Sequence, residues 1–342
     1  MSKNVKLIIK IIAILLVIVI IPFGGIMAYS NSNEAGVVPT YIWTENDTIN
    51  TSDMTSYQLD NDGEFKILQL SDVQFGLILP LGGKATAYIT DLINDTDPDL
   101  IIFAGDITSS PINGIIYREF VDFMDLFGIP YAVVFGNHDA EGRASKEKLA
   151  NILSEGKYSI FKYGPSNITG IGNYVVNVKN AENDIAWSLF MMDSNMYNGD
   201  YYDYIHEDQI DWYSWNVEKL KSENGGSLNS LAFFHIPLLE FAEAWGKRNT
   251  EEVTYVFGDK RETECASNYN SGMFETMVSL ESTKGVFVGH DHINDYSVIY
   301  KGIQLTYGLK STTNSYDEDG VRGGLLITLT DGSYTVEQIF RD

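Results

Sequence analysis

The chain has 342 residues, of which 44% are hydrophobic and 13% aromatic, a composition that predicts a packed globular core. Its formal net charge of −24 argues against binding to a nucleic-acid duplex, because proteins of that class carry basic patches that neutralise phosphates. The same charge repels anionic substrates, so a phosphate substrate would need a local positive group such as bound metal ions.

The first predicted element is an N-terminal signal or membrane anchor over residues 1–30. Three lysines within the first ten residues precede an uncharged, mostly apolar stretch at 11–29, close to the length of about 18–20 residues that a membrane span needs. Because no further Lys or Arg occurs before Lys66, the positive-inside rule places the rest of the chain outside the membrane. A small-x-small sequence at 28–30 leaves two outcomes open: a cell-membrane anchor with an extracytoplasmic domain, or a cleaved signal and a secreted protein. With Cys265 as its one cysteine, the exported chain would rely on its core rather than on disulfides.

Residues 31–60 are rich in Asn, Thr, Ser and Asp and are expected to be a linker, and residues 61–342 are expected to form one folded domain. In the first half of that domain, apolar runs typical of buried strands alternate with stretches whose apolar residues recur at helical spacing. The alternation predicts a parallel sheet covered on both faces, with functional residues at the carboxyl ends of its strands. The expected strands are 65–70, 100–104 and 131–135, and the expected helices are 84–94 and 117–127.

The second half of the domain contains more apolar runs and one helical stretch at 208–221. Segments 298–300, 304–306 and 325–330 are expected to be antiparallel strands that close a second sheet. The whole pattern predicts two sheets packed face to face with helices outside them. The other expected strands are 174–178, 186–192, 231–234 and 285–288.

Several of the expected strands end in side chains that can bind a metal ion. The chain has five histidines, and four of them lie in or beside the motifs at these strand ends. A set of oxygen and nitrogen ligands in which histidine is prominent suits Mn, Fe or Zn better than Ca or Mg. Any one of these residues could belong to a turn or to the core, but their gathering at strand ends predicts a metal site. The candidate ligands are Asp72, Asp106, Asn137, His235, His290 and His292.

The spacing within two motifs bears on the chemistry. His290 and His292 alternate, so on an extended segment both side chains would point to the same face and supply two imidazoles to neighbouring metals. Asn137 and His138 are adjacent and diverge, so one can bind a metal while the other faces the substrate.

Taken together in their order, these motifs resemble those of the calcineurin-like metallophosphoesterases, and more narrowly the branch related to purple acid phosphatases. The resemblance spans roughly residues 60–310. It is carried by the run from Gly63 to Asp72, and by Gly105-Asp106, Gly136-Asn137-His138-Asp139, Phe234-His235 and Gly289-His290-Asp291-His292.

This resemblance implies a four-layer αββα sandwich of two mixed β-sheets with a two-metal site. Asp106 would bridge both metals, Asp72 and His292 would complete one position, and Asn137, His235 and His290 would complete the other. A metal-bound hydroxide would attack the phosphorus in line, and both cations would stabilise the developing charge. In this scheme His138 would contact the phosphoryl group or protonate the leaving group, with Asp139 as its orienting partner.

The sequence departs from the family at Gln74, where relatives usually have a histidine two residues after the first aspartate. Two roles for Gln74 stay open: a weak metal ligand through its amide oxygen, or a hydrogen-bond partner of a ligand. A non-catalytic surface protein with a degenerate metal site is therefore an alternative to a phosphate-ester hydrolase.

The motifs are compatible with more than one substrate class. A phosphodiesterase fits them as well as a monoesterase, and the choice among Mn, Fe and Zn stays open, as does the oligomeric state. Lys310 and Arg143 could contact the substrate phosphate, but both are expected to be solvated surface residues. A tyrosine cluster between Tyr197 and Tyr204 is expected either to line the substrate site or to pack within its loop.

Overall fold

The computed structural model describes residues 38–76 and 83–341. The predicted N-terminal anchor, residues 1–30, lies outside this described part. Within the described residues, no helix is both long and apolar enough to cross a membrane.

A five-stranded mixed sheet contains the strands of the first half of the domain. Its strands are β2 (Glu64–Leu70), β3 (Leu100–Ala104), β4 (Tyr131–Val134), β14 (Gly323–Thr330) and β15 (Ser333–Phe340). Their order is β15-β14-β2-β3-β4. Strands β2, β3 and β4 run parallel, as predicted, and β14 pairs antiparallel with β2 and β15. All five residues of β3 are buried, as expected for a central strand covered on both faces.

An eight-stranded mixed sheet packs against the first. Its strands are β1 (Thr55–Gln58), β5 (Tyr174–Lys179), β6 (Ile185–Met191), β9 (Ser230–Phe233), β10 (Val253–Phe257), β11 (Thr283–Val288), β12 (Ser297–Tyr300) and β13 (Ile303–Tyr307). Their order is β1-β5-β6-β9-β11-β13-β12-β10. The neighbours β6, β9, β11 and β13 run parallel, so their carboxyl ends share one edge. A separate hairpin joins β7 (Tyr197–Asn198) to β8 (Tyr201–Tyr202).

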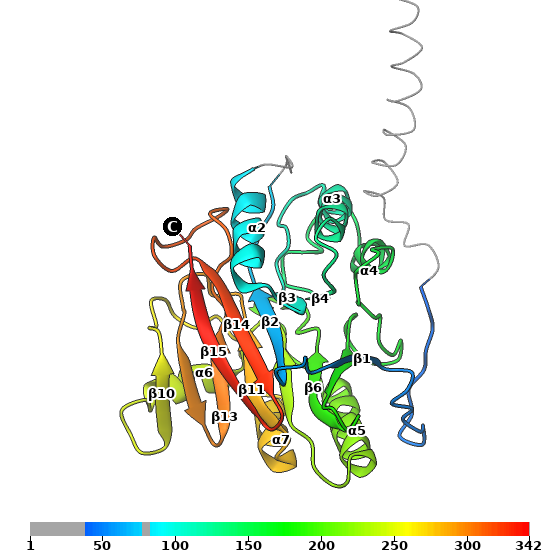
Figure 1. The fold of residues 1–342 in the computed structure, drawn as a ribbon. Helices are drawn as coiled ribbons and strands as arrows, with labels where there is room; N and C mark the ends of the chain where they lie inside the picture. Colours follow the sequence, from blue (N-terminus) through cyan, green and yellow to red (C-terminus); the bar gives the residue numbers. More distant parts are fainter. Residues whose placement is uncertain (1–37, 77–82, 342) are drawn as a thin grey trace, which may run out of the picture.

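Helices cover the outer face of each sheet (Figure 1). Those on the five-stranded sheet are α2 (Lys84–Thr96), α3 (Asn113–Asp125) and α4 (Lys146–Ser154). Those on the eight-stranded sheet are α5 (Glu207–Glu223), α6 (Leu239–Gly246) and α7 (Met273–Leu280).

Alternating side chains of β9 illustrate the layering. Leu231 and Phe233 belong to the core between the two sheets, and Ala232 belongs to the core beneath α5, α6 and α7. The predicted four-layer αββα sandwich of two mixed sheets is therefore confirmed.

Two sequence-based expectations about individual segments are wrong. The segment at 325–330 does not close the second sheet but forms β14, because Leu325, Ile327 and Leu329 fill the core next to the free edge of β2. The expected linker at 31–60 is not a plain tether in its described part. It contains β1, which extends the second sheet, and Trp43, which is buried against Trp215.

Candidate metal centre

The candidate ligands lie on loops that follow the parallel strands of both sheets. Asp72 follows β2 and Asp106 follows β3, while His235 follows β9. Asn137 follows β4, and the two histidines His290 and His292 follow β11. Because these strand ends share one edge of the sandwich, residues more than two hundred positions apart meet there.

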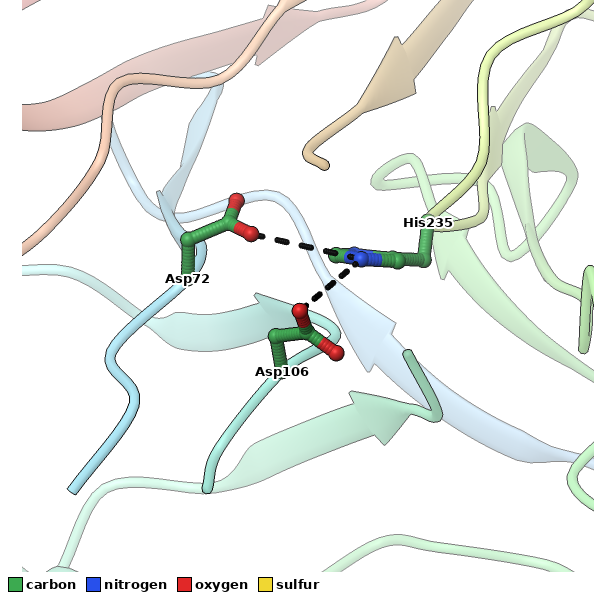
Figure 2. Close-up of side chains that lie close together, drawn as sticks. All are labelled: Asp72, Asp106 and His235. Atoms are coloured by element: carbon green, nitrogen blue, oxygen red, sulfur yellow. Dashed lines mark ion pairs between the residues drawn. The ribbon is translucent and has the colours of Figure 1, made fainter. Parts of the chain in front are cut away.

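Three side chains form the centre of the cluster (Figure 2). Ligand atoms of Asp72, Asp106 and His235 all lie within 4.8 Å of one another, and all three residues are buried. His235 Nε2 is 3.4 Å from Asp106 Oδ2 and 4.0 Å from Asp72 Oδ1. Figure 2 shows the three side chains pointing toward a common point from different loops.

Each carboxylate is held by one oxygen and offers the other to the cluster. Asp72 Oδ2 accepts hydrogen bonds from Ser71 Oγ at 2.5 Å and from the His290 backbone N–H at 3.0 Å. Asp106 Oδ1 accepts one from the His138 backbone N–H at 2.9 Å. The other oxygens, Asp72 Oδ1 and Asp106 Oδ2, are thereby directed toward His235.

The imidazoles are oriented in the way that metal-binding histidines usually are. His235 Nδ1 donates to the Ala104 carbonyl at 2.8 Å, and His292 Nδ1 donates to the Tyr316 carbonyl at 2.9 Å. Each histidine thus presents Nε2 to the cluster, where His292 Nε2 lies 3.5 Å from Asp72 Oδ1.

His290 reaches the cluster by a different backbone conformation from the one predicted. Its φ of 78° is left-handed, so the expected extended segment is wrong. His290 nevertheless faces the site, with Nδ1 3.3 Å from His235 Nε2. The two histidines of the motif therefore approach different sides of the cluster.

Three buried atoms of this cluster make no hydrogen bond within the part of the chain that the structure describes: Asp72 Oδ1, Asn137 Oδ1 and His290 Nε2. The Asn137 side-chain N–H donates to Tyr197 Oη at 3.1 Å, which leaves the amide oxygen directed elsewhere. Buried polar atoms nearly always have a partner, and an oxygen or nitrogen acceptor suits a metal ion. The residues present therefore fit metal ions.

The electrostatics of the cluster are strongly coupled. Burial alone would lower the pKa of His235, but Asp106 and Asp72 outweigh it and raise that pKa to about 10. Burial alone would raise the pKa of Asp72, yet the neighbouring positive groups hold it well below its usual range. Burial, together with the nearby His235, lowers the pKa of His290 to about 3, so this imidazole is neutral at pH 7. A neutral imidazole and ionised carboxylates are the forms that bind metals, so the His235 imidazole would release its proton when a cation binds.

The backbone around the ligands is unusual. Asp72, Gln74, Asp106 and His290 all have positive φ, at 53°, 46°, 54° and 78°. This conformation is uncommon for residues other than glycine, and such strain concentrates at functional sites.

Two motif residues must be glycine because another loop passes too close. A Cβ at Gly136 would collide with the backbone and carboxylate of Asp106, and one at Gly289 would collide with Ser71 Oγ and approach Asp72 Oδ2 to 2.6 Å. The close packing of these loops brings the ligands together.

His138 lies at the open side of the cluster, with a side chain that is 34% exposed. Its Nδ1 is 2.6 Å from Glu141 Oε2, and Tyr197 Oη donates to the other Glu141 oxygen at 2.6 Å. Burial alone would lower the pKa of His138, but Asp106 and Glu141 outweigh it and raise that pKa.

The carboxylate beside the His138 imidazole is thus Glu141 rather than the predicted Asp139. Asp139 is fully buried, and it accepts hydrogen bonds from the backbone N–H groups of Gly136, Asp106 and Thr108. Burial, reinforced by the charge of Asp106, raises the pKa of Asp139 to about 7. Asp139 therefore shapes the loop that carries Asn137 and His138.

Gln74 lies inside the cluster, and its amide nitrogen is 3.3 Å from His292 Nε2 and 3.4 Å from Asp106 Oδ2.

Lys310 does not occupy the solvated surface position expected for it. Its exposed fraction is 1%, and Nζ donates to the Asp72 carbonyl at 2.7 Å. Burial lowers the pKa of Lys310 to about 8, although Asp72 and Asp106 oppose this shift.

Sequence reasoning did not identify three residues beside the ligands. The rings of Tyr202 and His290 make a T-shaped contact with centroids 4.3 Å apart, and Tyr316 stacks on His292 at 4.1 Å. Tyr202 belonged to a tyrosine cluster whose role was left open. Glu141 had a usable signal, because it follows His138 by three residues within the same loop. Tyr316 had none, because its loop is distant in the sequence from every motif.

The comparison with family models decides the family. The calcineurin-like phosphoesterase model matches residues 65–294, which is more than half of the chain. The chain belongs to the calcineurin-like phosphoesterase family. Membership assigns it to the hydrolases that act on phosphoester bonds, and the predicted family resemblance is confirmed.

Curated relatives carry purple-acid-phosphatase names. The chain is 30% identical to "Probable inactive purple acid phosphatase 28" from Arabidopsis thaliana, over 72% of this chain and 70% of that protein. It is 29% identical to "Probable inactive purple acid phosphatase 29" from the same plant, over 76% of this chain and 75% of the relative. It is also 29% identical to "Phosphatase DCR2" from Saccharomyces cerevisiae, over 70% of this chain and 46% of that protein.

Solved structures support the fold. A dimetal phosphatase from Danio rerio matches with a TM-score of 0.50 at 12% identity, covering 80% of this chain and 98% of the other. GAP50, described as the anchor in the inner membrane complex of Plasmodium, matches with a TM-score of 0.50 at 13% identity, covering 81% and 84%. At these identities the likeness concerns the calcineurin-like phosphoesterase fold alone.

Gly136→Ala tests whether close loop packing holds the ligands in place. The added methyl group must displace Asp106, so we expect metal content after reconstitution to fall well below that of the wild type, as measured by elemental analysis. Gly246→Ala is the matched control, because a Cβ there meets nothing within 4 Å. If Gly136→Ala retained the metal content of the wild type, metal binding would not depend on the close packing of the loops that carry Gly136 and Asp106.

Proposed function

We propose that this protein is a metal-dependent phosphoesterase that hydrolyses phosphate esters by in-line attack at a dinuclear site. The observation that carries the proposal is a cluster of buried acceptors at Asp72, Asn137 and His290 that find no hydrogen-bond partner in the described part of the chain. They surround Asp106 and His235. The family adds support, because calcineurin-like phosphoesterases act on phosphoester bonds.

The proposed ligands fall into two sets that share Asp106. Asp72 and His292 would hold one cation, with Gln74 beside them, and Asn137, His235 and His290 would hold the other. Mn, Fe or Zn suits these ligands. When bound, such cations supply Lewis acidity toward the phosphoryl oxygens and a nucleophile at neutral pH. They also supply the local positive charge that an anionic substrate needs on a chain with a net charge of −24.

His138 is proposed to act on the leaving group. Glu141 engages Nδ1, so the other ring nitrogen, Nε2, would carry the proton to the departing oxygen. The raised pKa of His138 favours the protonated form that a general acid requires. Glu141 is proposed as the residue that positions this imidazole, with Tyr197 holding Glu141 in turn.

His138→Ala should reduce kcat for an alkyl phosphate, a poor leaving group, by roughly 10²–10⁴-fold, the usual contribution of general acid catalysis. The loss should be smaller for p-nitrophenyl phosphate, which needs little protonation, and metal content should not change. Glu141→Gln should show the same leaving-group dependence with a smaller loss. His206→Ala, at the N-cap of α5, is the control. Equal losses with both leaving groups would contradict the proposed proton transfer.

Removal of metal should abolish turnover of both p-nitrophenyl phosphate and bis(p-nitrophenyl) phosphate, and Mn²⁺ or Zn²⁺ should restore at least one activity. The thermal unfolding midpoint should rise with added cation, because the folded state alone presents the assembled site. Undiminished hydrolysis by protein shown to be metal-free would refute the proposal. The relative rates on the two esters would distinguish a monoesterase from a phosphodiesterase.

We also propose that residues 1–30 direct export and tether the domain to the outer face of the cell membrane. The support is the sequence pattern of three lysines followed by an uncharged apolar stretch at 11–29. The full chain with a C-terminal tag should sediment with membranes, and protease added to intact cells should digest it. A variant that lacks residues 1–30 should stay inside the cell. Protection of the full-length protein from external protease would contradict export, and release into the medium would indicate cleavage.

A further inference from the structure

The Gln74 amide donates hydrogen bonds to side-chain atoms that would otherwise bind one of the two cations. Its amide nitrogen lies 3.3 Å from His292 Nε2 and 3.4 Å from Asp106 Oδ2. Because His292 Nδ1 donates to the Tyr316 carbonyl, His292 Nε2 carries a lone pair and accepts from the amide. Two proposed ligand atoms of the Asp72–His292 metal position, His292 Nε2 and Asp106 Oδ2, therefore already accept a hydrogen bond.

Lys310 determines which end of the Gln74 amide faces the ligands. Its Nζ is 3.4 Å from Gln74 Oε1, and an ammonium group can only donate. The reversed amide would set its NH₂ group against the ammonium and its oxygen against the Asp106 carboxylate. Both contacts therefore favour the same orientation, in which a donor and not a ligand atom points at the metal position.

The backbone holds Lys310 in this place. The Ser311 N–H donates to the Ser71 carbonyl at 2.9 Å, and Thr312 Oγ1 donates to the Val73 carbonyl at 2.6 Å. The segment after β13 is thus bound along the loop that carries Asp72 and Gln74. The Lys310 ammonium, 1% exposed and bonded to the Asp72 carbonyl, also repels a cation on this side.

The opposite side of the cluster is arranged differently. Asn137 Oδ1 and His290 Nε2 have no hydrogen-bond partner among the described residues. On the Gln74 side, Asp72 Oδ1 is the one cluster atom without a hydrogen-bond partner among the described residues. Asp106 is shared by both positions, and His235 Nε2 lies 3.3 Å from His290 Nδ1, so these two ligands do not separate the positions. The difference lies in Asn137 Oδ1 and His290 Nε2, which have no partner among the described residues, against His292 Nε2, which accepts from Gln74.

We propose that the two metal positions are unequal: Asp106, Asn137, His235 and His290 bind one cation tightly, and the Lys310–Gln74 pair makes the Asp72–His292 position weak. This inference rests on the proposed metal-dependent function. It implies that the protein carries one cation at low metal concentration and recruits the second as the concentration rises. The rate of hydrolysis should then rise with occupancy of the weak position. The thermal unfolding midpoint should rise with occupancy of the tight position.

The test titrates the chelator-treated full chain with Mn²⁺ and measures free Mn²⁺ by its six-line electron paramagnetic resonance signal. The wild type should bind one Mn²⁺ tightly and a second with a Kd at least about tenfold higher. Gln74→His should lower the second Kd by roughly 10–100-fold, the range that changes beside a metal ligand usually produce, and should yield a spin-coupled Mn²⁺ pair. The first Kd should change little.

Two further variants keep the result interpretable. Lys310→Met frees the Gln74 oxygen to turn toward the metal, so it should also tighten the second position. If that variant does not fold, as judged by its thermal midpoint, Gln74→His decides alone. Gln304→His is the matched control, because Gln304 bonds Ser297 and Tyr334 outside the cluster and should leave both Kd values unchanged.

The outcomes separate the inference from the proposed function. Two equal Kd values in the wild type, or an unchanged second Kd in Gln74→His, would overturn the unequal positions while leaving a metal-dependent enzyme. Absence of any Mn²⁺ binding by the folded wild type would refute the metal-dependent function, and the inference with it.

Discussion

The structure depends on the close approach of loops from two sheets, which sets carboxylates and imidazoles with free lone pairs at one buried point. Asp72, Asp106 and His235 lie within 4.8 Å of one another although they follow three different strands. Buried groups of this kind are unfavourable without partners, so the fold must hold them there at some energetic cost. Backbone strain, glycine contacts and the orientation of each ligand all serve this arrangement.

The strain is distributed over the loops that carry the ligands. Left-handed conformations at Asp72, Asp106 and His290 turn the chain sharply where each strand ends, and glycine at 136 and 289 lets neighbouring loops touch. Residues such as Asp139 bind backbone N–H groups and keep these turns in place. A phosphoesterase site built in this way has its ligands positioned before the cations arrive.

Much of the fold and most of the cluster could be predicted from the sequence, for a physical reason. Buried parallel strands are continuous apolar runs whose carboxyl ends share an edge of their sheet. Polar motifs after β2, β3 and β4 therefore had to meet at one edge, and those after β9 and β11 at an edge of the other sheet. Strand β14 was assigned to the wrong sheet, because an apolar run does not reveal its neighbour. The extended conformation expected for the last motif failed because φ at His290 depends on contact with the Asp72 loop.

The partners of the ligands were harder to predict than the ligands. Lys310 suggested a surface residue, since lysine is rarely buried, and its packing along the loop after β2 explains its contact with Gln74. Glu141 and Tyr316 contact His138 and His292 through loop geometry that has no periodicity. These partners orient the side chains that line the cluster.

Anomalous diffraction from crystals grown with Mn²⁺ tests the central claim most directly. The account predicts an anomalous peak between Asp106 and His235, within bonding distance of Asn137 Oδ1, and a weaker peak beside Asp72 and His292. A cluster that stays closed by hydrogen bonds among its own side chains, with no anomalous peak at saturating Mn²⁺, would contradict it.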